Sequence, residues 1–300
     1  MSGRTSLNRL LRTLGAILML GGLLTPGAVH ALAVGDTVSD VLRISGKDVP
    51  LPAGPHTVIS LGFAQITQPE YGAQVNPDDY GPVRRIVLMR AEGGLVADIV
   101  EVVVNTLPHP DGWGIATDCT RDDIYATLTR YKSGWDVSCM WVLPSSPIWL
   151  GDTVRPVDDG AAAHAMEADL VMPELFVEAG FRVANRYDAV EVRYQFAALD
   201  DGSPARGSAM EAWLPERIAD APEPLAKVQS VAAWASSVYP AVEQGLRVPL
   251  AEGTAFANPF DDITFTGKTT DRAQRLAELE ILREIGHRVP GGIRSAEGHH

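Results

Sequence analysis

Two strand-like runs separated by a pair of glycines constrain the fold of this chain more than any other feature. Residues 84–92 and 95–105 are rich in valine, isoleucine and other apolar residues, and Gly93-Gly94 lies between them. Glycine adopts positive φ without strain, so this pair suits the two-residue turn that joins antiparallel strands. The sequence therefore predicts a β-hairpin.

The register of this hairpin decides which side chains share a face. With a two-residue loop, Ile86 is expected opposite Glu101 and Leu88 opposite Ile99. Arg84 then becomes a diagonal neighbour of Glu101, and an ion pair between them is expected to satisfy the carboxylate. Because both faces carry many apolar residues, we expect the hairpin to lie between two layers of structure.

The periodicity of apolar residues predicts the remaining elements. Alternating or β-branched runs predict further strands over 57–65, 137–143 and 188–198, with a long loop over 68–82. Apolar residues three and four apart predict helices over 158–171 and 224–246, the latter kinked at Pro240, and a last helix from Asp271 to about Pro290. Strand patterns thus dominate the first half of the chain and helical patterns the second.

Only two cysteines are present, Cys119 and Cys139. A single pair in an exported chain is most simply a disulfide, because no histidine lies near either cysteine to activate a thiolate. The predicted fold class is therefore α+β: a mainly antiparallel β-sheet in the N-terminal half, helices packed from the C-terminal half, and one disulfide.

The N-terminal segment predicts export. Three arginines among the first twelve residues precede an apolar run over 14–24, and the small residues of 31–33 suit a signal peptidase. An uncleaved anchor is the alternative, but the apolar run is shorter than the roughly 20 residues that span a bilayer. We expect a cleaved signal peptide over 1–33, with cleavage before Val34, one exported domain over 34–289 and a disordered tail over 290–300. The expected location is the periplasm or the extracellular space, as a soluble rather than membrane-spanning protein of the cell envelope.

The charge of the chain limits its partners. The full sequence has a net charge of −13, and removal of the predicted signal peptide, which contains arginine but no acidic residue, makes the protein more acidic still. An acidic protein repels the phosphates of nucleic acids and anionic lipid headgroups, so neither is expected as a partner.

The sequence lacks the common catalytic and metal-binding motifs. The sequence contains no Gly-x-Ser-x-Gly turn, no Ser-x-x-Lys motif and no phosphate-binding loop. The interior histidines lie far apart, and the Asp-Asp pairs lack the spacing of a calcium loop. We therefore expect no cofactor and no metal site.

Aromatic residues concentrate around the two cysteines. One interpretation is that tryptophans pack on the disulfide as a core, and the other is that they form a concave binding surface edged by charged residues. The residues expected to bind in the second case are Trp113, Tyr125, Tyr131, Trp135, Trp141, Trp149 and Arg121. A short helix over 122–131 is expected within this region, with acidic residues in its first turn.

Two functions follow from this region. The favoured one is an exported, non-catalytic protein that binds an envelope protein or a small ligand through the aromatic residues around the disulfide. The alternative is an exported hydrolase that acts on a glycan or an ester with a pair of carboxylates. The candidate catalytic residues are Asp118, Asp122 and Glu101, because a carboxylate in an apolar setting can acquire a pKa suited to proton transfer.

Overall fold

The structure is a computed structural model that describes residues 31–65, 82–108, 113, 117–133, 136–147, 154–199 and 208–261. The predicted signal peptide up to residue 30, the loop over 68–81, the helix from Asp271 and the tail over 290–300 lie outside these residues. From Ala33 onward the described residues belong to one compact unit.

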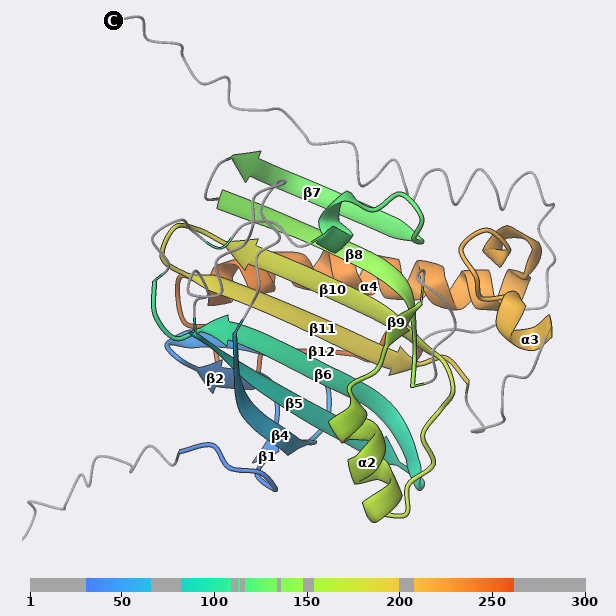
Figure 1. The fold of residues 1–300 in the computed structure, drawn as a ribbon, viewed down its shortest axis with the longest axis horizontal. Helices are drawn as coiled ribbons and strands as arrows, with labels where there is room; N and C mark the ends of the chain where they lie inside the picture. The colour runs from blue at the N-terminus through green and yellow to red at the C-terminus, as the bar shows by residue number, and fades with distance from the viewer. Residues whose placement is uncertain are drawn as a thin grey trace, which may run out of the picture. The chain divides into compact units, whose positions relative to one another are not determined.

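A nine-stranded sheet forms the centre of the fold (Figure 1). Its strands follow the order β1 (Thr37–Val38), β4 (His56–Gln65), β5 (Pro82–Glu92), β6 (Leu95–Asn105), β11 (Ala189–Ala197), β10 (Phe176–Ala184), β8 (Asp136–Ser146) and β7 (Ala126–Ser133). These neighbours all pair antiparallel, while β9 (Arg155–Pro156) adds a short parallel pairing to β8. The prediction of a mainly antiparallel sheet is confirmed.

Helices cover both faces of this sheet. Figure 1 shows α4 (Pro222–Gly245) behind the sheet, where it packs on β10 and β8, and α2 (Asp159–Glu167) in front of it. A smaller sheet of β12 (Ala255–Phe256), β3 (Lys47–Pro52) and β2 (Val41–Ile44) also contacts α4. The short elements are η1 (Thr117–Thr120), α3 (Ser208–Glu211) and η2 (Ile218–Asp220). The α+β class is thus confirmed.

The two faces of the sheet have different cores. On the α4 face, Phe181 and Tyr194 make an edge-to-face contact with ring centroids 5.7 Å apart, and Tyr194 meets Trp234 of α4 at 5.0 Å. On the α2 face, Ala161 and Ala165 of α2 pack in one cluster with apolar residues of β5 and β6. Pro240 lies inside α4, which continues on both sides of it. No helix among the described residues is long and apolar enough to cross a membrane.

The hairpin is confirmed, but its predicted register is wrong beyond the turn. Next to the turn, Glu92 pairs with Leu95 as expected, and a bulge between Arg90 and Ala91 then shifts the pairing by one residue. Glu101 consequently lies opposite Val87 and not opposite Ile86. Because a shift of one residue exchanges the two faces of a strand, Glu101 points to the α2 face.

Two further elements differ from expectation. The helix predicted over 122–131 is wrong, because the chain turns at η1 and then enters β7, where Thr127 and Leu128 pair with β8. The central strand β10 was not predicted at all, because Glu178, Gly180 and Arg182 interrupt its apolar pattern. These interruptions lie on one face of the strand and belong to the site described next.

Candidate functional site

A group of ionic side chains lies on the α2 face of the sheet. The strand registers bring it together: Glu101 on β6 lies opposite Arg193 on β11, and Glu191 on β11 lies opposite Arg182 on β10. We call this group the charged network. Its members are Arg85, Glu101, Asp118, Arg155, Asp158, Glu178, Arg182, Glu191 and Arg193.

One part of the charged network is a chain of alternating charges across four strands. Arg85 donates a 2.7 Å hydrogen bond to Glu101, whose other oxygen accepts one of 3.2 Å from Arg193. Arg193 also donates to Glu191 at 2.5 Å, and Arg182 donates to the same carboxylate at 3.0 Å. Each carboxylate in this chain therefore lies between two guanidinium groups, which offsets the cost of removing it from water.

Arg155 connects the rest of the charged network. Its guanidinium donates to Asp118 of η1 and lies 3.3 Å from Glu178 of β10. Glu178 is fully buried and also accepts a 2.9 Å hydrogen bond from the indole of Trp141. On the α2 side, Arg85 donates to Asp158, which caps the first turn of α2 by accepting from Ala161.

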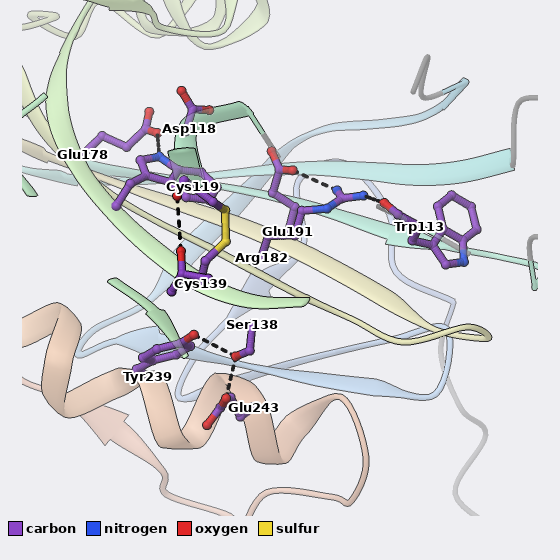
Figure 2. The surroundings of a disulfide bond; sticks show 12 residues. Trp113, Asp118, Cys119, Ser138, Cys139, Glu178, Arg182, Glu191, Tyr239 and Glu243 are labelled. Atoms are coloured by element: carbon purple, nitrogen blue, oxygen red, sulfur yellow. Dashed lines mark hydrogen bonds and ion pairs between the residues drawn. A yellow bond between two sulfur atoms is a disulfide. The ribbon is translucent and has the colours of Figure 1, made fainter. Parts of the chain in front are cut away.

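The disulfide borders this network (Figure 2). Cys119 of η1 and Cys139 of β8 are bonded, as predicted, and they share a core cluster with Trp113 and Trp141. Figure 2 shows Arg182 between the carboxylate of Glu191 and the backbone carbonyl of Trp113, to both of which it donates. The cluster thus adjoins the charged network through the hydrogen bond from Arg182 to Trp113.

The electrostatics of the network keep Glu191 and Arg193 ionised. Burial alone raises the pKa of Glu191, but the guanidinium groups of Arg193 and Arg182 outweigh it and hold that pKa below its ordinary value. Burial opposes the charge of Arg193, yet Glu191 and Glu101 raise its pKa above the ordinary value. Glu191 is therefore a permanent anion near neutral pH, unlike a general acid, which must hold a proton there.

Two buried polar atoms stand out on β11. Arg193 Nε and Gln195 Oε1 have no hydrogen-bond partner among the residues that the structure describes. Gln195 is only 1% exposed, and its amide nitrogen donates to Ser145 at 3.2 Å and to Glu178 at 3.1 Å. Because residues 193 and 195 point to the same face of β11, the donor and the acceptor without partners lie on the same side of the sheet.

The aromatic residues expected to bind fall into two groups. Trp113, Tyr125 and Trp141 are fully buried, so they belong to the core and cannot offer an open surface. Trp135 and Trp149 lie outside the described residues, and for Tyr131 the structure describes only its place on β7. A role of these last three residues in binding therefore stays a prediction.

The candidate carboxylates are separated by the fold. Asp118 is buried and lies between Arg155 and Arg121, whereas Asp122 is exposed. Arg121 also donates to Asp123 at 2.7 Å, and this hydrogen bond lowers the pKa of Asp123. Nothing in this geometry pairs Asp118 with Asp122 across a cleft.

Glu101 does take part in an ion pair, but its partner differs from the expected one. The predicted partner Arg84 is wrong, because the bulge turns Glu101 to the face of Arg85. Arg85 on β5 and Glu101 on β6 each interrupt a mainly apolar strand. The sequence signal for the network was therefore present, since a charged residue inside an apolar strand requires a buried partner.

The network does not provide a metal site. No group of three or more histidine, cysteine, aspartate or glutamate side chains is placed to hold a metal ion within the described part of the chain. Its carboxylates face arginines instead, which occupy the oxygen atoms that a cation would need.

Comparison with known proteins adds no assignment. No family model matches the chain, and neither a curated protein nor a solved structure does.

Proposed function

We propose that this chain is an exported, non-catalytic protein that binds a polar ligand, either a small molecule or a polar segment of an envelope protein, at the charged network. The observation that carries this proposal is the unpartnered pair on β11, Arg193 Nε and Gln195 Oε1. A ligand that carries both an acceptor and a donor, as hydroxyl and amide groups do, supplies the kind of partner that each atom lacks. A buried polar atom without a hydrogen bond lowers the stability of the folded protein, so a ligand that bonds to these atoms gains binding free energy.

The state of the charges supports binding over hydrolysis. Glycoside or ester hydrolysis requires a carboxylic acid that can donate a proton near neutral pH. Glu191 is instead kept ionised by two arginines. A fixed charge of this kind orients a ligand without taking part in proton transfer.

Two features support the export part of the proposal. The basic and apolar start of the chain has the pattern of a signal peptide, with cleavage before Val34. The disulfide between Cys119 and Cys139 is of a kind that persists in oxidising compartments such as the periplasm or the extracellular space.

Native purification tests this function. The protein is isolated from the exported fraction of its own cells, denatured, and the released molecules are identified by mass spectrometry. We expect one species in near-stoichiometric amount from the wild type, and at least about tenfold less from Arg193→Lys, which keeps the charge but loses the Nε donor.

Arg121→Lys is the matched control, because it makes the same change at an arginine outside the Arg193 and Gln195 pair. The account predicts that this variant retains the species. Loss in Arg121→Lys with retention in Arg193→Lys moves the binding site to the aromatic region, where Trp135→Ala and Trp149→Ala then become the informative variants. Wild-type protein that carries no bound species contradicts the proposal.

A further inference from the structure

Among the described residues, the outer edge of β4 is paired only near the start of the strand. Near its start, Gly35 donates to the carbonyl of Val58 and Val58 donates to Asp36, both at 2.8 Å. β1 pairs only with His56 and Thr57. From residue 59 to 65, no described residue pairs with the side of β4 that faces away from β5.

The direction of the backbone groups on this edge follows from the ladder. Val58, which pairs with Leu88, directs its N–H and C=O away from β5. Past the bulge, Leu61 pairs with Ile86 and Phe63 pairs with Arg84, two and four positions from Leu88. Because hydrogen-bonded and non-hydrogen-bonded pairs alternate in an antiparallel ladder, Leu61, Phe63 and Gln65 direct their backbone groups outward as Val58 does. These groups form a template for one more strand.

The side chains of this edge do not protect it. Residues 57–65 contain no charged residue and no proline, in a chain with a net charge of −13. Phe63 is 80% exposed, and Gly62 is exposed with open space around it. An exposed, uncharged strand edge of this kind invites pairing with another strand.

The opposite edge of the same sheet is protected. β7 carries Arg130 and Lys132 and has a bulge between Thr129 and Tyr131. Arg130 is held in place by a 2.5 Å ion pair with Glu243 of α4. Charges and bulges on an edge strand discourage the approach of a further strand, so the two edges of the sheet differ in the feature that controls association.

We propose that the outer edge of β4, residues 59–65, pairs antiparallel with the same edge of a second copy of the chain. An extended segment without charge suits this edge best, because residues 57–65 offer no charged side chain to pair with a charge on the occupant. The chain itself supplies such a segment. Head-to-tail pairing of β4 with β7 is disfavoured by the protected edge, which leaves the closed two-fold arrangement. This inference is independent of ligand binding at the charged network.

The size of this contact sets the expected affinity. A two-fold axis near Phe63 pairs Leu61 of one copy with the Gln65 position of the other and forms about six backbone hydrogen bonds. A contact made by one strand is smaller than a standard stable interface, so we expect a dissociation constant in about the micromolar range.

Light scattering coupled to size-exclusion chromatography tests the proposal on protein purified natively from cells. We expect the wild type to be a dimer at tens of micromolar and to dissociate on dilution. Phe63→Pro removes an outward N–H and should weaken the dimer by more than about tenfold. Phe63→Val removes the same ring but keeps the N–H, so it should weaken the dimer less than the proline variant does.

A crosslinking measurement covers the case in which Phe63→Pro fails to fold. Both native cysteines are in the disulfide, so Gly62→Cys introduces a single free thiol at a position with room for a side chain. A short bis-maleimide should join two copies of Gly62→Cys, and should not join two copies of Thr127→Cys on β7. A monomeric wild type, a complex with a different protein at this edge, or crosslinking only through Thr127→Cys overturns the proposal.

Discussion

Ser138 on β8 donates a 2.5 Å hydrogen bond to the carboxylate of Glu243 on α4 (Figure 2). Because the only proton of the serine hydroxyl is used in this bond, the 2.7 Å contact between Ser138 and Tyr239 must be donated by the tyrosine. Ser138 and Tyr239 are fully buried. These three side chains thus join the helix to the back of the sheet.

Replacing Ser138 with alanine should destabilise the protein. The change removes the Ser138 hydroxyl that bonds to both Tyr239 and Glu243 inside the protein, so we expect the free energy of unfolding to fall by about 1–3 kcal/mol. Urea denaturation measures this loss. Ser236→Ala is the control, because Ser236 is exposed on the same helix and bonds only within it, and its effect should stay within about 0.5 kcal/mol. Equal effects of the two substitutions contradict the assignment.

The contact between Gly180 and Trp141 makes a second stability prediction. A Cβ atom at Gly180 would overlap the indole ring of Trp141, whereas one at Gly62 would meet nothing within 4 Å. We therefore expect Gly180→Ala to cost about 1–3 kcal/mol through overpacking, and Gly62→Ala to be neutral or slightly stabilising. Thermal unfolding of both variants checks this, and a Gly180→Ala variant as stable as Gly62→Ala would be inconsistent with the packing described.

Removing the disulfide should lower stability without changing the pairing of the strands. The bond joins residues 20 positions apart, and the loss of such a crosslink costs about 3 kcal/mol in the chain-entropy model. The variant with both Cys119→Ser and Cys139→Ser should show this loss in urea denaturation. Thiol titration of the native wild type should find no free thiol, and a reading of two thiols per chain would contradict the bond.

Glu191 should make stability dependent on pH in the acid range. Its folded pKa lies below the ordinary value of 4.5, because the nearby arginines outweigh the effect of burial. The contribution of its charge is therefore complete above the unfolded pKa and is lost as the pH falls through the folded pKa. Near neutral pH, Glu191→Gln should cost about 3 kcal/mol, since it leaves two arginines short of a counter-charge.

The comparison of Glu191→Gln with the wild type has a clear sign. The difference in the free energy of unfolding between the two proteins should shrink as the pH is lowered from about 7 to about 3, because the wild type then loses the same charge. Urea denaturation across this range measures the difference. A constant or growing difference would show that Glu191 is not stabilised as an anion.

The predictability of this fold differs between its elements for physical reasons. The hairpin, β11 and α4 were predictable because their apolar residues repeat with the period of a strand or a helix. β10 was not, because the polar residues that interrupt its apolar pattern have partners far away in sequence, such as the Trp113 carbonyl for Arg182 and the Trp141 indole for Glu178. A pattern within one segment contains no information on such partners.

The site shows the same limit. Glu101 is recognisable from sequence as a carboxylate in an apolar strand. Its partner, however, depends on the register shift at the bulge between Arg90 and Ala91, and no residue pattern in the sequence predicts that bulge. The disulfide was predictable because only one pairing of two cysteines exists. Arg155 and Gln195 escaped notice, because β9 is only two residues long and a single glutamine in a strand is usually a surface residue.

The most direct test of the proposed function follows the Nε–H of Arg193 by nuclear magnetic resonance. The probe is the pool of small molecules and peptides extracted from the exported fraction, added to protein labelled with ¹⁵N. The account predicts that the Arg193 Nε–H signal shifts on addition of the extract while that of Arg121 stays in place. An extract that binds the protein without moving the Arg193 signal, or that does not bind at all, would contradict the assignment of the charged network as the binding site.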